Sequence, residues 1–237
     1  MEEQGLHKKS YHKVIDYIKN QIREGRLESG GKLPTERDLS EILGVSRNSV
    51  REAMRSLEII GVISSHQGAG NYLTGNFESS LMESLSMMFL LNQIDYQQIS
   101  QLRRALEMQA LMLAIDHITE QEIAEQVEII AQLEHETEDI NVILDKRFHY
   151  NIAKASKNVL ITNILQALSD LLDNFIFDLR RDILRTEDSR KILNEAHNDM
   201  MKSLILRDKD LAREAINKHF GIIDEKLSLS EKKTDNK

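Results

Sequence analysis

The stretch of sequence that decides the fold spans residues 32–53 and reads KLPTERDLSEILGVSRNSVREA. Within it, Thr35 followed three residues later by Asp38 has the pattern of a capping box, which opens a helix. Gly44 ends that helix, and Ser46 is a good N-cap for the next one. The stretch therefore predicts two short helices joined by a tight turn, which is a helix-turn-helix.

The flanking segments complete a winged helix-turn-helix. Apolar residues at helical spacing predict a preceding helix that contains Tyr11, Val14, Ile15, Ile18 and Ile22. After Gly61, residues 62–65 are typical of a strand, residues 66–70 of a glycine-containing turn, and residues 71–73 of a return strand. We expect this hairpin to be the wing of a DNA-binding domain over residues 1–75.

Beyond Gly75 the sequence becomes a nearly continuous amphipathic helical pattern, with no glycine before Gly221. The predicted helices cover residues 79–92, 95–116, 119–136, 140–156, 158–185, 188–206 and 209–228. Short polar joints make successive helices antiparallel neighbours. The fold is therefore expected to be mainly α. An antiparallel all-α bundle of six to seven helices should occupy residues 76–230, followed by a disordered tail over 231–237.

Composition excludes several classes of protein. The 237 residues contain no cysteine, which excludes disulfides and thiolate metal sites. No segment approaches the ~18 apolar residues that suggest a membrane span, and the N-terminus does not resemble a signal peptide. We expect a soluble cytoplasmic protein with no membrane partner. The net charge of −8 divides into +1 over residues 1–75 and −9 over residues 76–237, so the local placement of charge must decide whether nucleic acid is bound.

The second helix of the helix-turn-helix carries arginines on one face. Arg47, Arg51 and Arg55 follow one another at intervals of four residues, opposite the apolar side of the same helix. A packed helix with outward cations suits the major groove, where an arginine can pair with the edge of guanine. A solvated charged face is the alternative for the arginines alone, but the caps, the turn glycine and the wing together favour DNA binding.

Residues 32–40 and 44–53, with Leu57, Gly61 and the wing segment 66–70, resemble the GntR family of transcriptional regulators. The resemblance implies DNA contacts at Arg37, Ser46, Arg47, Asn48, Ser49, Arg51, Gln67 and Gly68. His66 stands where an arginine is frequent in the family, and a neutral imidazole contributes less charge to the wing.

Four residues of the helical half have the chemistry of a metal site. Asp145 and His149 lie four residues apart and share a helix face, while His197 and His219 belong to the last two predicted helices. One carboxylate and three imidazoles are a ligand set for Zn²⁺, and also for Ni²⁺, Mn²⁺ or Fe²⁺. On the residues alone, a helix-stabilising Asp–His pair remains the alternative.

The second half also resembles the helical effector domain (FCD domain) of the FadR-like branch of the GntR family. The matching segments are 102–107, 145–149, 156–158 and 195–197, with His219. The resemblance implies that Asp145, His149, His197 and His219 bind a divalent metal, with Zn²⁺ the expected ion, and leave a position open for a small carboxylate effector.

Arg103 is the expected partner of that effector, because guanidinium groups bind carboxylates in a bidentate manner. A salt bridge to Glu107 is its alternative role. Arg104 is adjacent on the same helix and would therefore point elsewhere.

Together these features predict a non-enzymatic, sequence-specific regulator, a repressor that acts as a homodimer on a palindromic operator in double-stranded DNA. Two alternatives remain open. A metal-dependent hydrolase or lyase for small organic acids could be fused to the DNA-binding head, since a metal site can activate water. An acyl-CoA-responsive regulator is the other, although a polar metal cavity suits a small acid better than a long acyl chain.

Overall fold

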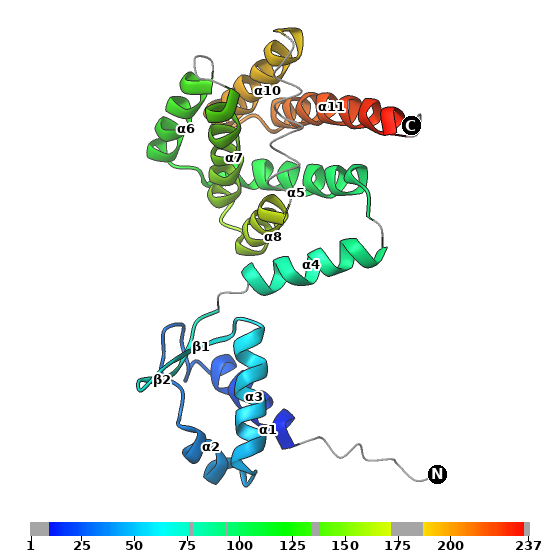
Figure 1. Ribbon diagram of the computed structural model, residues 1–237. Coiled ribbons are helices and arrows are strands. Elements are labelled where there is room, and N and C mark those ends of the chain that lie inside the picture. The colour runs from blue at the N-terminus through cyan, green and yellow to red at the C-terminus, as the bar shows by residue number, and fades with distance from the viewer. Residues whose placement is uncertain (1–9, 76–77, 93, 134–137, 172–186, 235–237) are drawn as a thin grey trace, which may run out of the picture. The chain divides into compact units, whose positions relative to one another are not determined.

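The computed structural model describes residues 10–75, 78–92, 94–133, 138–171 and 187–234 (Figure 1). The chain divides into two units, Met1–Glu83 and Ser84–Lys237. Each unit contains its own cluster of buried apolar side chains. The division falls within helix α4 (Glu78–Asn92).

The N-terminal unit is a winged helix-turn-helix, as predicted. Its elements are α1 (Ser10–Arg23), α2 (Glu36–Leu43), α3 (Arg47–Ile59), β1 (Ile63–His66) and β2 (Gly70–Leu73). The two strands pair antiparallel, with Ile63 opposite Leu73 and His66 opposite Gly70. The chain before α2 lies along the outer side of β2, where Leu33 N donates to Asn71 O at 2.9 Å.

The predicted caps of α2 and α3 are confirmed. The Thr35 side chain accepts from Asp38 N at 3.2 Å, and the Asp38 carboxylate accepts from Thr35 N at 3.2 Å. Gly44 ends α2 with a φ of 61°, a left-handed conformation that costs glycine little. Ser46 then accepts from Ser49 N at 3.1 Å and opens α3.

Burial of one side of α3 fixes which side remains available. Val50, Ala53, Met54 and Leu57 point into the core of the N-terminal unit. Each large apolar side chain buried in this way stabilises the fold by about 1.5–3 kcal/mol. The arginine-bearing side of α3 is consequently held outward.

Strand β1 begins one residue later than the sequence predicts, and strand β2 begins one residue earlier. Val62 precedes β1, and His66 and Gly70, placed in the turn by the sequence, form the last strand pair. The glycines indicate that a turn is present. The ends of the two strands depend on the hydrogen bonds between them, which the sequence pattern does not reveal.

The C-terminal unit is a bundle of helices, and the predicted mainly α fold is confirmed. The described helices that follow α4 are α5 (Tyr96–His117), α6 (Glu120–Leu133), α7 (Glu138–Ala155), α8 (Val159–Leu171), α10 (Glu187–Leu206) and α11 (Lys209–Thr234). Helix α5 packs against α7, α8, α10 and α11 (Figure 1). The core between these helices includes the fully buried rings of Phe148 and Phe220.

Most predicted helix ends lie within one or two residues of the observed ends, and residues 134–136 of the helix predicted over 119–136 lie outside the described residues. Helix α11 continues to Thr234, beyond the predicted end at residue 228, so residues 231–234 are helical where a disordered tail was expected. No glycine or proline follows Gly221 to stop the helix, and Glu and Lys favour helix. Residues 172–185 of the helix predicted over 158–185 lie outside the described residues.

Glu122, in the first turn of α6, contacts both the residue before α6 and a residue just after α7. Its carboxylate accepts from Thr119 N at 2.8 Å, in a capping-box arrangement, and from Lys157 Nζ at 2.8 Å. The hydrogen bond from Lys157, followed by that from the Thr119 backbone, lowers the pKa of Glu122 from 4.5 to about 2.

We expect Glu122→Gln to lower the free energy of unfolding by about 1 kcal/mol at neutral pH, the size of one helix cap. Because the folded-state pKa of Glu122 is depressed, its stabilisation is present above about pH 4.5 and is lost as the pH falls through about 2. Urea denaturation of both proteins as a function of pH measures the difference. A constant difference down to the lowest pH would contradict the ionic role, and Glu128→Gln, on the exposed side of α6, is the matched control.

Candidate functional site

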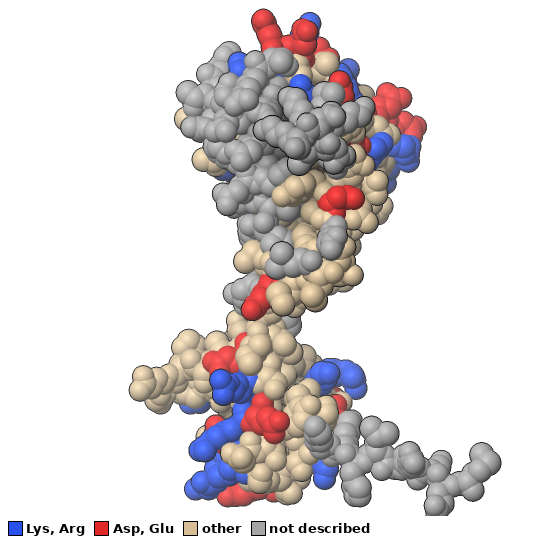
Figure 2. Space-filling model, turned by 45° about the vertical axis from the view of Figure 1, so that its right-hand side comes forward, with Lys and Arg blue, Asp and Glu red and all other residues tan. Residues whose placement is uncertain are grey.

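The residues predicted to contact DNA lie on α2, on α3 and in the turn of the wing. The exposed residues among them are Arg37, Ser46, Arg47, Asn48, Arg51, Gln67 and Gly68, while Ser49 is half-buried. In the face drawn by Figure 2, Lys and Arg side chains lie on both sides of the N-terminal unit, with Asp and Glu among them. Local basic character therefore coexists with a nearly neutral domain.

Two of these arginines are paired with carboxylates. Arg51 Nε donates to Glu36 Oε2 at 2.8 Å, and Arg37 Nε lies 3.6 Å from Glu41 Oε1. Both pairs are largely exposed, so each stabilises the protein by less than about 1 kcal/mol. A phosphate or a base edge must compete with these carboxylates for the two guanidinium groups.

Lys32 adds an exposed cation beside the wing. Gly68 has a φ of 76° at the tip of the turn. The exposed Lys32 ammonium lies 5.9 Å from the centre of the Tyr72 ring, and Lys32 pairs with Tyr72 across a β-bridge. Sequence reasoning did not single out Lys32, because only the bridge to β2 places it beside the wing.

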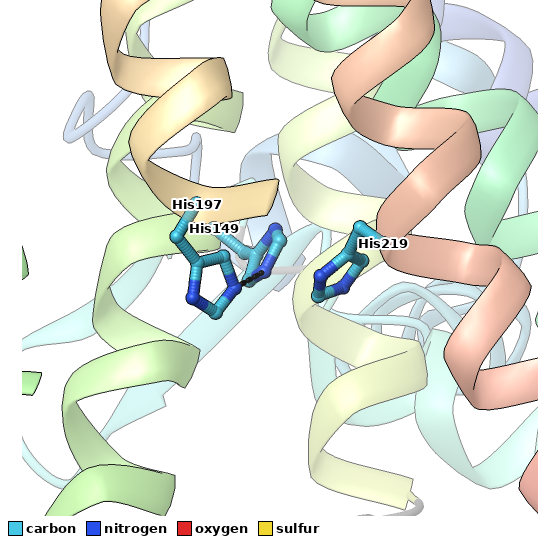
Figure 3. A group of neighbouring side chains, drawn as sticks. All are labelled: His149, His197 and His219. Carbon is cyan, nitrogen blue, oxygen red and sulfur yellow. Dashed lines mark hydrogen bonds between the residues drawn. The ribbon is translucent and has the colours of Figure 1, made fainter. Parts of the chain in front are cut away.

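Three of the four predicted metal ligands, the histidines, form one cluster inside the C-terminal unit, and Asp145 lies beside two of them. Asp145 and His149 lie on α7, His197 on α10 and His219 on α11. Figure 3 shows the three imidazole rings turned toward one another. One ring nitrogen from each lies within 4.8 Å of the others, and Asp145 Oδ1 lies 3.0 Å from His197 Nε2 and 3.7 Å from His149 Nε2.

This donor set fits a divalent ion. With metal–ligand bonds of about 2.0–2.1 Å, neighbouring ligands of a tetrahedral ion are about 3.4 Å apart, and opposite ligands of an octahedral ion about 4.2 Å apart. His149 Nε2 and His197 Nε2 are 3.3 Å apart, which is close to the spacing of two ligands of a tetrahedral ion. The widest nitrogen spacing must close by less than about 1 Å to reach octahedral geometry. A bound ion would act as a Lewis acid toward a carboxylate or a water.

Glu107 is a buried residue of this site that sequence reasoning noted only as a possible partner of Arg103. Its Oε1 accepts from Arg103 Nη2 at 2.8 Å, and its Oε2 lies 2.9 Å from His149 Nδ1. The spacing of four residues signals the first contact. The second depends on the packing of α5 against α7, which no local pattern reveals.

The charges of this cluster are fixed by their neighbours. Burial alone would raise the pKa of Glu107, but Arg103 and then His149 outweigh it and hold that pKa at about 2. Burial would lower the pKa of His149, but Glu107 and then Asp145 outweigh it and raise that pKa to about 9. These neighbours therefore favour the carboxylate form of Glu107 and, while no metal is bound, the charged form of His149.

A cavity opens beside the histidine cluster, with about 480 Å³ of empty space, part of it open to solvent. It is lined by Arg103, Glu107, Asp145, Lys146, His149, Tyr150, Leu165, Gln166 and Ser169. Arg103 thus faces the cavity, although it is paired with Glu107. Arg104 instead turns to α11, where Nη2 donates to Asn217 Oδ1 at 2.6 Å.

Comparison with known protein families agrees with both halves of this arrangement. The profile described as "Bacterial regulatory proteins, gntR family" matches residues 10–73, and the FCD domain profile matches residues 98–221. The chain belongs to the GntR family and carries an FCD domain. It is thus a transcriptional regulator of the GntR/FCD type, and its predicted resemblance to this family is confirmed.

Similar proteins extend over most of this GntR-family chain. The HTH-type transcriptional regulator YcbG of Bacillus subtilis (strain 168) is 29% identical over 90% of this chain and 88% of its own. An Escherichia coli K12 protein, named as a proposed L-lactate dehydrogenase operon regulator, is 30% identical over 89% of this chain and 83% of its own. The solved Streptococcus agalactiae GntR structure has the same fold, with a TM-score of 0.66 at 24% identity, covering 90% of this chain and 98% of its own.

These relatives are named as regulators, which favours a regulator over the enzyme alternative. Among the described helices of this GntR-family chain, we find none with the length and apolarity required to traverse a bilayer.

Proposed function

We propose that this GntR-family regulator is a homodimeric repressor that binds a palindromic operator and releases it when a small carboxylate occupies the metal site of the FCD domain. Arg37, Ser46, Arg47, Asn48, Ser49, Arg51, Gln67 and Gly68 contact the DNA in this proposal. Asp145, His149, His197 and His219 hold a divalent ion, for which Zn²⁺ is the first candidate, and Arg103 binds the effector's carboxylate.

The observation that carries the proposal is the meeting of three histidines and Asp145 beside a cavity that Arg103 lines. A metal ion and a guanidinium on one wall are suited to an acid that coordinates the metal through one oxygen and pairs with Arg103 through another. The name of the Escherichia coli relative makes L-lactate the first acid to test.

Regulation requires that the effector distinguish between two arrangements of the dimer. An acid that binds both arrangements equally well shifts neither, however tight its binding. We therefore expect the acid to bind the free repressor more tightly than the operator complex, and the operator to weaken acid binding by the same factor.

The experiment is a melting-temperature screen that crosses Zn²⁺, Ni²⁺ and Mn²⁺ with L-lactate, other hydroxy acids and citrate, followed by operator titrations with any stabilising pair. Stabilisation by an acid only in the presence of metal, with a loss of operator affinity, supports the proposal. A protein that no divalent metal stabilises would overturn the metal-dependent mechanism. Consumption of an acid during the assay would instead favour the hydrolase or lyase alternative.

Arg47→Ala is expected to weaken operator binding by about 1–3 kcal/mol and to relax the preference at one base position, as for a lost bidentate contact to guanine. Arg47 is exposed in the first turn of α3, where recognition helices meet bases. Fluorescence anisotropy with the operator and with single-base variants measures both effects. Arg104→Ala, which removes an arginine of the C-terminal unit, is the control. An unchanged base preference in Arg47→Ala would exclude Arg47 from base recognition.

A further inference from the structure

Glu107 lies between two residues to which the proposed function gives different tasks. Its carboxylate is buried, with a side-chain exposure of 5%. Oε1 accepts from Arg103 Nε at 3.1 Å and from Arg103 Nη2 at 2.8 Å, while Oε2 lies 2.9 Å from His149 Nδ1. One carboxylate therefore contacts both the arginine of the cavity and a histidine of the metal cluster.

The two ring nitrogens of His149 face different groups. Nδ1 faces Glu107, and Nε2 faces the cluster, at 3.3 Å from His197 Nε2 and 3.7 Å from Asp145 Oδ1. A carboxylate on one ring nitrogen fixes the tautomer and the orientation of a metal-binding histidine and makes its other nitrogen a better ligand. With Nδ1 held by Glu107, Nε2 is the nitrogen presented to a metal.

We propose that Glu107 is the positioning residue of the metal site, which holds His149 with Nε2 toward the ion, and that it links this ligand to Arg103. The inference rests on the proposed function, because it assumes that His149 binds a metal. Glu107 contacts His149 and is not itself assigned as a ligand.

The link to Arg103 gives the site a second property. The carboxylate of an acid that enters the cavity competes with Glu107 for the same guanidinium. When Arg103 pairs with the acid, Glu107 is left to pair with His149 alone. The contact between Glu107 and His149 then becomes stronger, and metal binding by His149 becomes more favourable. Metal and acid then assist each other's binding by the same factor, as linkage requires.

The test is zinc binding to the metal-stripped full-length protein, measured by competition with a chromophoric chelator at fixed pH. Glu107→Gln is expected to weaken zinc binding about 10–100-fold, the usual effect of losing such a partner. Glu107→Asp keeps the charge but withdraws the carboxylate by one methylene, and it is expected to lose a similar factor. Glu128→Gln, on the exposed side of α6, should bind zinc like the original protein.

A second readout separates positioning from a purely structural role. The visible absorption of bound Co²⁺ reports the ligand geometry, and it is expected to change in Glu107→Gln and Glu107→Asp. If Glu107→Gln does not fold, the double substitution Arg103→Gln/Glu107→Gln removes both charges of the pair and is measured in its place.

The outcomes distinguish the two proposals. If the original protein binds no zinc, the proposed function fails and the inference with it. If the original protein binds zinc and both Glu107 variants bind zinc as tightly as it does, the positioning role is overturned while the proposed function stands. If Glu107→Asp alone retains full affinity, the charge of Glu107 and not its contact with His149 supports the metal, and the positioning role is also overturned.

Discussion

His197→Ala is expected to abolish the stabilisation of this protein by zinc. His197 is buried on α10, and its Nε2 lies 3.0 Å from Asp145 Oδ1 and 3.3 Å from His149 Nε2. Its ring is therefore central to the donor set. We expect its loss to weaken zinc binding at least about 100-fold, which corresponds to about 2.7 kcal/mol. Melting curves recorded with and without zinc measure the stabilisation, and chelator competition measures the affinity.

The control is His117→Ala, which removes an exposed histidine at the end of α5. This variant should respond to zinc like the original protein. Operator binding by metal-free His197→Ala should match that of the original metal-free protein, because the residues proposed to contact DNA belong to the other unit. If zinc stabilises His197→Ala as it does the original protein, the ligand set proposed here is wrong.

The DNA-binding half could be predicted from the sequence because its signals are local. Thr35 and Asp38 are three residues apart, and Gly44 and Ser46 mark the turn, so the chain itself carries the geometry of α2 and α3. The strand ends could not be predicted as closely, because the pairing of His66 with Gly70 depends on a ladder between two segments.

The metal cluster depends on contacts that are distant in sequence. The spacing of Asp145 and His149 places them on one face of a helix, but nothing in the sequence itself brings α10 and α11 to that face. Residue chemistry made His197 and His219 candidate ligands, but only the family resemblance favoured the four-residue set over a helix-stabilising pair of Asp145 and His149. The role of Glu107 escaped for the same reason, since its contact with His149 joins α5 to α7.

Arg103 shows how one local rule can support two interpretations. The spacing of Arg103 and Glu107 predicts a salt bridge, and that bridge is present at 2.8 Å. The same side chain lines the cavity beside the histidines, where an effector's carboxylate is proposed to bind. Arg103 can pair with Glu107 and also bind an effector's carboxylate, because a guanidinium has five N–H donors to share.

The largest loss of stability is expected from Phe148→Ala. Phe148 is fully buried on α7, and its ring lies 5.4 Å from that of His149 and 5.2 Å from that of His197, edge to face. Truncation of a buried phenylalanine leaves a cavity and costs about 3–5 kcal/mol. Phe148→Leu fills most of this volume and is the matched control, with an expected cost of less than about 1.5 kcal/mol.

Because Phe148 also packs against two proposed ligands, its removal should loosen the metal site. We expect zinc at 100 times the dissociation constant of the original protein to stabilise that protein by about 2.7 kcal/mol, and Phe148→Ala by less. Hydrogen exchange locates the damage. Amides of α7 and α10 should lose protection while those of α3 keep it, since Phe148 and α3 belong to separate apolar clusters. Equal loss in α3 would mean that the two units unfold together, and an unchanged response to zinc would mean that the histidines do not need the Phe148 ring to stay in place.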